Sequence, residues 1–143
     1  MEGKHSDVTG KIIGAFYDVY NSLGYGFLEK VYENALAIEL RRRGLTVELQ
    51  KQIQVFYRGQ LVGEYFADMV VADLVVVEIK AAKTIVNQHE AQLLNYLKAT
   101  HYEVGLLLNF GPKPGHRRKV YDNELKTNLE RVNRTRINTD KHR

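Results

Sequence analysis

The stretch that decides the fold is residues 65–80, which read YFADMVVADLVVVEIK. Two apolar, valine-rich runs flank Ala72-Asp73, and runs of this length and composition predict β-strands. Because only two or three residues separate the runs, we expect a tight hairpin. The second run, residues 74–80, is so continuously apolar that it indicates a buried strand.

Three charged residues interrupt this hairpin. Glu78 and Lys80 end the second strand, and their spacing of two places both on one face. If Ala72-Asp73-Leu74 forms a three-residue loop, Asp68 falls opposite Glu78, with the Cβ atoms about 5 Å apart. A two-residue turn would instead put Asp68 on the other face. The first register predicts one cluster of three side chains, and the ordinary alternative is a surface ion pair of Glu78 with Lys80.

The predicted cluster has the chemistry of a metal site. An ionised carboxylate on a buried strand costs several kcal/mol unless it is paired or bound to a metal. Two carboxylates at this spacing repel unless a cation lies between them. Oxygen ligands, in a chain without cysteine and without a convincing set of histidines, suit Mg²⁺, with Mn²⁺ as a substitute, rather than zinc.

The rest of the chain supplies three helices and further strands. Apolar residues at helical spacing predict a helix that Ser6 or Asp7 caps and the glycines after Leu23 end, and two more over about 28–43 and 88–100. Alternating apolar residues predict a strand within 45–57, and the apolar run 104–108 predicts a strand in the middle of the sheet. A short edge strand is predicted over 119–121. This order indicates an α/β fold with a mixed sheet flanked by helices.

Length and composition narrow the class of protein. A chain of 143 residues has the length of one domain, and the lack of cysteine excludes disulfides, thiolate zinc sites and cysteine nucleophiles. No apolar run approaches the ~20 residues of a membrane span, and the first ten residues contain no apolar leader. We therefore expect a globular cytoplasmic protein without a membrane anchor.

Charge divides the chain into two parts. Residues 111–143 carry 10 basic and 4 acidic side chains, whereas the first 110 residues carry 11 basic and 13 acidic ones. We expect a globular domain over residues 1–120 and a basic, partly flexible C-terminal tail over 121–143. Such a tail attracts polyphosphates through salt-sensitive contacts, and a solvated, frayed terminus explains the same charge.

Two helices carry further polar candidates. Glu29 and Glu33, four residues apart, share a face of the second helix, where Glu29 also suits the positive end of the helix dipole. His89, Gln92 and Tyr96 share a face of the third helix. Each of these residues also has an ordinary structural explanation, so none identifies a site alone.

Taken together, the motifs resemble those of a known superfamily. Helices, three strands, a helix and a strand, with Asp68 on the second strand and Glu78-Ile79-Lys80 on the third, resemble the restriction-endonuclease-like αβββαβ core of the PD-(D/E)XK nuclease superfamily. More closely, Thr9 to Val120 resembles the GxxExxY protein family. The matching segments are Gly26-Phe27-Leu28-Glu29-Lys30-Val31-Tyr32, Glu33-Asn34-Ala35-Leu36, Ala67-Asp68, Val77-Glu78-Ile79-Lys80-Ala81, residues 89–97 and Leu106-Leu107-Leu108-Asn109-Phe110-Gly111.

The resemblance implies a role for each matching residue. Asp68 and Glu78 would hold a divalent metal, and Lys80 would orient or activate the attacking water. Glu29 would be the acidic residue that the superfamily places on the helix before the sheet, with Glu33 as the alternative because the helix phase does not choose between them. Gln92 and Tyr96 match the Gln-x-x-x-Tyr signature of RecB-type nuclease domains, at the edge of the active site.

The function that follows is a Mg²⁺-dependent nuclease that hydrolyses phosphodiester bonds, in DNA rather than RNA according to the resemblance. The main alternative is a nucleic-acid-binding or interaction module that keeps the fold without turnover. A homodimer with two active sites is a further expectation from the superfamily. Tyr20, Tyr25 and Phe27 either stack on bases or fill the space between helices, and core packing is the interpretation that the sequence favours.

Overall fold

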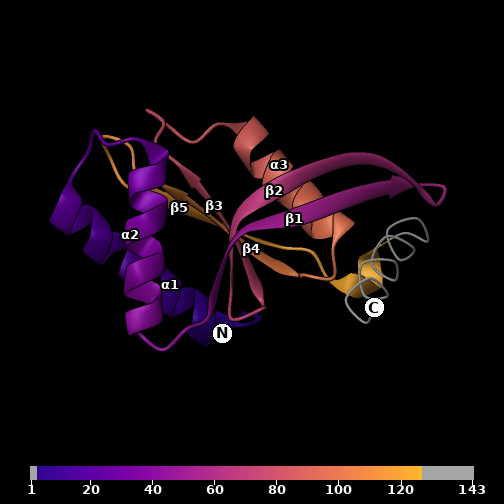
Figure 1. The fold of residues 1–143 in the computed structure, drawn as a ribbon, viewed down its shortest axis with the longest axis horizontal. Coiled ribbons are helices and arrows are strands. Elements are labelled where there is room, and N and C mark those ends of the chain that lie inside the picture. The colour runs from indigo at the N-terminus through magenta and orange to yellow at the C-terminus, as the bar shows by residue number, and fades with distance from the viewer. Residues whose placement is uncertain (1–2, 127–143) are drawn as a thin grey trace.

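Two N-terminal helices pack together on one face of the sheet (Figure 1). In the computed structural model, which describes residues 3–126, α1 spans Ser6–Leu23 and α2 spans Glu29–Arg42. The prediction that Ser6 or Asp7 caps α1 is wrong, because the preceding residue is His5 and its side chain makes no capping hydrogen bond. Gly44, at a φ of 85°, ends α2 as predicted, since glycine adopts this left-handed conformation without strain.

The sheet has five strands in the order β1-β2-β3-β4-β5. All neighbours are antiparallel except β3 and β4, so the sheet is mixed, as predicted. The helix α3, Asn87–Ala99, makes the crossover between the two parallel strands. The strand bounds are Val47–Tyr57 for β1, Gln60–Val71 for β2, Val75–Lys80 for β3, Val104–Asn109 for β4 and Gly115–Val120 for β5.

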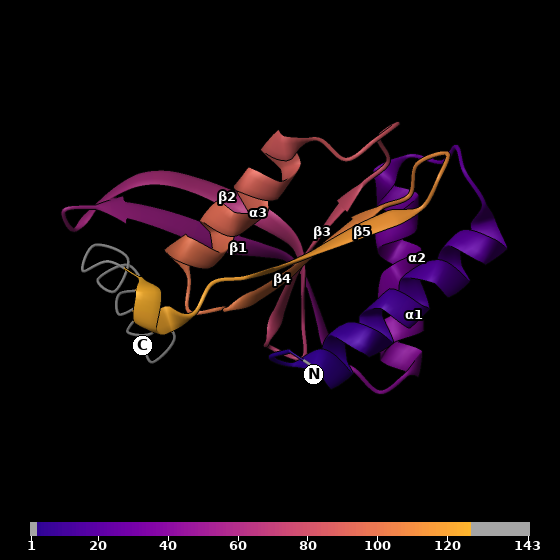
Figure 2. The same ribbon diagram turned by 180° about the vertical axis from the view of Figure 1, so that it is seen from behind.

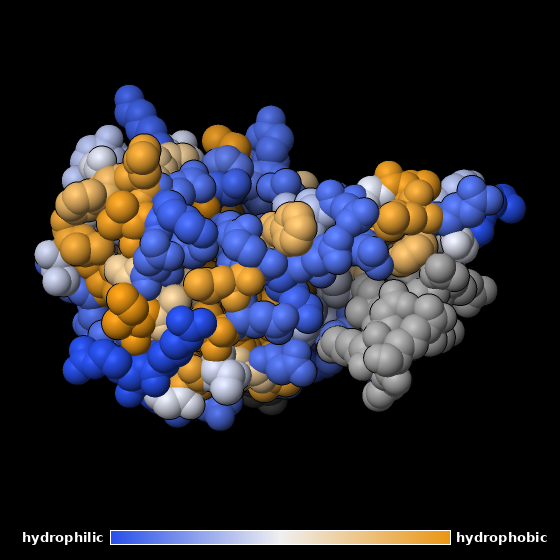
Figure 3. All heavy atoms as spheres, viewed as in Figure 1, coloured by the Kyte–Doolittle hydropathy of each residue, from blue (hydrophilic) through white to orange (hydrophobic). Residues whose placement is uncertain are grey.

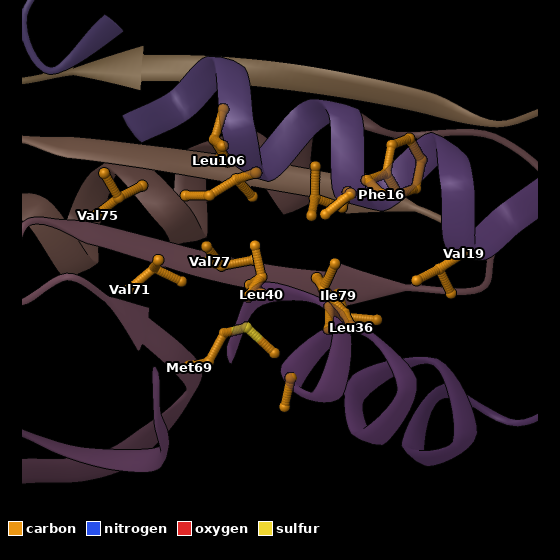
Figure 4. Close-up of a cluster of buried hydrophobic side chains, with 14 of the residues drawn as sticks. Phe16, Val19, Leu36, Leu40, Met69, Val71, Val75, Val77, Ile79 and Leu106 are labelled. Carbon is orange, nitrogen blue, oxygen red and sulfur yellow. The ribbon is translucent and has the colours of Figure 1, made fainter. Parts of the chain in front are cut away.

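Helices cover both faces of the sheet and enclose two apolar clusters. On one face Val75, Val77 and Ile79 pack against α1 and α2, as the close-up in Figure 4 shows. On the other face Val76 and Leu107 pack against α3. Full burial of each such side chain stabilises the fold by about 1.5–3 kcal/mol. This two-sided burial explains why residues 74–77 are apolar without alternation.

The edge strand β5 is longer than predicted. It begins at Gly115 rather than Lys119 and ends at Val120, paired antiparallel with β4. Its residues are polar because the strand lies at the sheet edge, where Arg117 and Lys119 form ion pairs with Glu90 of α3. A pattern of buried apolar side chains therefore gives no signal for it.

The hairpin of β1 and β2 extends beyond the body of the sheet as a two-stranded arm, seen in both Figure 1 and Figure 2. Near the body, the pair Leu49 and Met69 packs toward α1 and α2, whereas farther out Ile53 and Ala67 pack in the α3 cluster. The face of the arm that is buried therefore changes between Leu49 and Ile53 on β1. The change coincides with Gln50, which has a φ of 52°.

Hydrogen bonds fix the last described residues to the body of the protein. Residues 121–126 pack on the body: Tyr121 donates its backbone N–H to Glu103 O over 2.8 Å, and Lys126 Nζ donates to Tyr102 O over 3.1 Å. The rest of the predicted tail lies outside the described residues. Among residues 3–126, no helix is both long and apolar enough to cross a membrane.

Candidate active site

Asp68 of β2 and Glu78 of β3 lie together just beyond Met69↔Val77, where the pairing of these two strands ends. The register Val71↔Val75 and Met69↔Val77 confirms the three-residue loop, which is closed by a hydrogen bond from Leu74 N–H to Val71 O of 3.0 Å. The backbone N–H of Asp68 donates to Glu78 Oε2 over 3.0 Å. The backbone N–H of Ile79 donates to Asp68 Oδ2 over 2.7 Å. The odd loop thus brings the two carboxylates together, as the first register predicted.

These two hydrogen bonds take the place of the strand ladder. The pairing of β2 with β3 ends at Met69↔Val77, beyond which β2 continues into the arm. Backbone N–H groups that leave a ladder need new acceptors when they are buried. The Asp68 and Glu78 carboxylates supply these acceptors, so each side chain also holds the other strand in place.

Glu78 is a buried acid with an altered pKa. Its exposed fraction is 7%, and this burial raises the pKa of its carboxyl to about 8. The negative charge of Asp68 acts in the same direction, while the ammonium group of Lys80 lowers the pKa. A neighbouring cation would oppose this shift, because it stabilises the charged form of a carboxylate.

Lys80, half-buried at the end of β3, is held through its backbone. Its carbonyl accepts a hydrogen bond of 2.7 Å from Phe110 N–H, just beyond β4. The buried amide of Asn109 accepts from Ala82 N–H over 2.9 Å and donates to Ala82 O over 3.0 Å. A Cβ added at Gly111 would lie 2.0 Å from Ala82 O, so only glycine allows this close approach. The segment that leaves β3 is therefore clamped to the end of β4.

Tyr96 joins the cluster from α3, which covers the face of the sheet opposite to α1 and α2. The side chain is buried, and its pKa is raised by burial first and then by the charge and a side-chain hydrogen bond of Glu78. Its ring lies 4.4 Å from that of Tyr65 on β2. Burial followed by the charge of Glu78 raises the pKa of Tyr65 to about 12. Both tyrosines therefore remain neutral near Glu78, where a hydroxyl can donate to its carboxylate.

The two glutamates of α2 differ in their surroundings. Glu29 is exposed at the first position of the helix, whereas Glu33 has an exposed fraction of 4%. Glu33 Oε1 accepts from Gln50 Nε2 over 3.0 Å, and its Oε2 pairs with Lys30 Nζ at 2.8 Å. Gln50 lies between Leu49 and Lys51, which pair with the two neighbours of Asp68. Glu33 is thus the buried acid of α2, and its carboxylate contacts the strand β1 that pairs with β2 on both sides of Asp68.

Gln92 does not join the cluster. It is exposed on α3, and within the described residues its side chain makes no hydrogen bond, as is also true of Glu29. The structure therefore brings together Asp68, Glu78, Lys80 and Tyr96, while Glu33 contacts Gln50 on the neighbouring strand β1. Gln92 and Glu29 lie outside this group.

Sequence reasoning missed Gln50, Tyr65 and the specific role of Asn109. Nothing in the sequence distinguishes Gln50 from other strand glutamines. The position of Asn109 could have indicated its role, because a buried amide at the end of an apolar strand in the middle of a sheet needs hydrogen-bond partners. The three consecutive arginines at the end of α2, Arg41 to Arg43, make local contacts: Arg41 donates to Val47 O, Arg42 pairs with Glu39, and Arg43 pairs with Asp18 and Glu39.

The donor chemistry of the cluster fits a divalent cation. Two adjacent carboxylates offer hard oxygen ligands, and Mg²⁺ is commonly held by one or two carboxylates with water and substrate phosphates completing its shell. Within residues 3–126, no group of three or more His, Cys, Asp or Glu side chains is arranged to hold a metal ion. The donor set is therefore the carboxylate pair, which leaves ligand positions for a substrate.

The chain matches a family model and is similar to a solved structure. The model of the PD-(D/E)XK nuclease superfamily matches residues 6–131. A solved structure titled "Crystal structure of SSO0001" is similar, with a TM-score of 0.48 and 17% sequence identity. The match covers 89% of this chain and spans 63% of that chain's length. No match is found among curated proteins.

Proposed function

Because the chain belongs to the PD-(D/E)XK nuclease superfamily, we propose that it is a metal-dependent nuclease that hydrolyses phosphodiester bonds in DNA. The observation that carries the proposal is the Asp68–Glu78 pair where β2 leaves β3, with Lys80 beside it. Glu78 is buried beside the half-buried Asp68, and burial raises the free energy of a charged acid, so the pair carries a cost that a bound cation would offset.

Each side chain has a part in the proposed reaction. Asp68 and Glu78 would hold a divalent cation through their carboxylate oxygens. When bound, the cation supplies a Lewis acid beside the scissile phosphate and lowers the pKa of water. Lys80 donates hydrogen bonds from its ammonium group to the phosphate or to the attacking water as negative charge develops. Tyr96 places a neutral hydroxyl group near Glu78, where it can donate to the carboxylate.

The finer assignments rest on the resemblance. They are DNA rather than RNA, Mg²⁺ with Mn²⁺ as substitute, a homodimer and membership of the GxxExxY family. Gly26 and Tyr32 of that motif support the last point, because Gly26 adopts a φ of 119° and the Tyr32 hydroxyl donates to Gly24 O over 2.5 Å. A nuclease domain over residues 1–120, a basic tail over 121–143 and a cytoplasmic location remain predictions.

A cleavage assay tests the proposal. We expect the protein to cut at least one of a panel of labelled single-stranded, duplex, branched and RNA substrates in Mg²⁺ or Mn²⁺, and a chelator to abolish the cutting. Asp68→Asn, which keeps the size of the side chain, should also remove it. Binding without cleavage across the panel would favour the alternative, a nucleic-acid-binding module without turnover. Cleavage that persists in Asp68→Asn would contradict the proposed site.

The two glutamates of α2 make a matched pair for a second test. Glu33→Gln should lower the cleavage rate about tenfold to a hundredfold, because it changes the buried carboxylate that positions Gln50 beside Asp68. Glu29→Gln should change the rate less than threefold, because Glu29 is exposed. Single-turnover rates of both variants measure the difference. The opposite ranking would assign the helix acid to Glu29, as the resemblance first implied.

A further inference from the structure

Two large aromatic side chains are exposed on the loop between α1 and α2. The exposed fraction of Tyr25 is 61% and that of Phe27 is 48%, so neither fills the space between the helices. The preference for core packing is therefore wrong for both residues. Tyr20 differs, because its hydroxyl donates to Gly111 O and Pro112 O over 2.9 Å each.

The loop that carries these aromatics is ordered by specific contacts. Gly24 and Gly26 have φ values of 73° and 119°, which side-chain-bearing residues rarely adopt. The Tyr32 hydroxyl donates to Gly24 O and accepts from Phe27 N–H over 3.2 Å. A loop held in this way presents Tyr25 and Phe27 in a fixed place. Aromatic rings exposed on a fixed loop indicate a binding surface.

A short series of contacts joins this loop to Lys80. The ring of Phe27 lies 6.1 Å from that of Tyr32, which stacks on Phe110 at 4.3 Å with an interplanar angle of 16°. The backbone N–H of Phe110 donates to Lys80 O. Figures 1 and 2 agree that the α1–α2 loop, the end of β3 and the β4–β5 turn meet at one end of the molecule.

Positive charge lies on the two other loops at this end. Lys83 follows β3, Lys113 lies in the turn between β4 and β5, and both are exposed. Asn109 joins the two loops through its bonds to Ala82. Exposed aromatics beside lysines are the combination that binds single-stranded nucleic acid, in which rings stack on bases and cations contact phosphates.

We propose that Tyr25 and Phe27 form a base-stacking platform that binds an unpaired strand of the substrate next to Lys80. This proposal rests on the proposed function and names its substrate class, since a duplex keeps the faces of its bases stacked on one another and closed to protein rings. The platform selects single-stranded nucleic acid or the unpaired part of a branched one. Lys83 and Lys113 hold the phosphates on either side.

A protein partner is the competing occupant of the neighbouring surface. Figure 3 shows apolar side chains gathered over α2 and the adjoining loop, and the exposed ones of α2 and the residue before it include Leu28, Val31 and Ile38. These aliphatic residues begin at Leu28, next to Phe27, and continue along the helix to Ile38. Aliphatic side chains offer no ring for stacking, so the two surfaces are separable by mutation.

Binding without turnover tests the platform. Fluorescence anisotropy in chelator, with a labelled 20-nucleotide single strand and the matched duplex, measures affinity independently of cleavage. We expect tighter binding of the single strand, a loss of about tenfold in that affinity for Tyr25→Ala and for Phe27→Ala, and a change in duplex affinity below twofold. Tyr25→Trp should retain the affinity. Tyr57→Ala, at a similarly exposed tyrosine of the arm, is the matched control.

The outcomes separate this inference from the proposed function. Equal losses for single strand and duplex, or no loss in Tyr25→Ala, would overturn the platform. A change in oligomeric state by sedimentation, with single-strand affinity unchanged, would overturn it in favour of a protein-binding surface. Tyr25 makes few contacts, so its variant folds even if Phe27→Ala does not. If no substrate is cleaved but Tyr25→Ala still loses single-strand affinity, the nuclease assignment fails and the platform stands.

Discussion

Replacing Lys80 with alanine is expected to lower the single-turnover rate of phosphodiester cleavage by about 10²–10³-fold. The ammonium group is the cation that this chain places beside Glu78, where it lowers the pKa of the carboxyl. Without it, the negative charge that develops on the phosphate loses a hydrogen-bond donor and a compensating charge. The rate of the variant, measured at saturating metal on a substrate that the wild type cuts, gives the size of the effect.

The fold should survive this substitution. Lys80 is half-buried, and the contacts that hold its position come from its backbone carbonyl and from Ala82 rather than from its side chain. The melting temperature should therefore change by only a few degrees. Lys11→Ala, at an exposed lysine of α1, is the matched control and should cleave at the wild-type rate. A Lys80→Ala protein that cleaves within threefold of wild type would exclude this lysine from the chemistry.

Replacing Glu78 with glutamine is expected to stabilise the metal-free protein at alkaline pH. The pKa of Glu78 is raised from the model-compound value of 4.5 to about 8, so between these pH values the folded state binds more protons than the unfolded state. The free energy of unfolding of the wild type therefore falls as pH rises from about 4.5 to about 8. Glutamine does not ionise, so the variant should lack this decline.

The size of the effect is large for one substitution. At pH 8.5 the variant should exceed the wild type by about 1–3 kcal/mol, a rise of several degrees in melting temperature, while at pH 5 the two should be nearly equal. Added Mg²⁺ should stabilise the wild type, more at pH 8 than at pH 6, and leave the variant unchanged. Glu124→Gln, at an exposed glutamate, is the control. Parallel pH profiles for wild type and Glu78→Gln would show that Glu78 ionises normally.

The hairpin at the centre of the site was predictable because local chemistry determines it. The break at Ala72-Asp73 and the apolar residues on both sides are compatible with two registers, which differ by one residue in the loop. The structure has the odd loop, with φ values of 55° and 52° at these two residues. Asp68 and Glu78 consequently lie together, which a sequence pattern with period two could anticipate.

The residues that could not be predicted depend on how separate elements meet. The phase of α2 is set by Tyr32, Leu36 and Leu40 against the sheet, and this packing turns Glu33 inward rather than Glu29. The exposure of Tyr25 and Phe27 likewise follows from where the α1–α2 loop lies relative to the sheet. A single sequence shows which residues are aromatic, but it does not show which of them the fold buries.

The clamp between the ends of β3 and β4 determines when the proposed site can form during synthesis. The acids and the lysine lie between residues 68 and 80, yet the groups that fix the backbone after Lys80 are supplied by Asn109 and Phe110. A nascent chain that has emerged only as far as α3 has the reactive side chains without the strand that aligns them. The proposed site is therefore complete only after nearly the whole domain has left the ribosome.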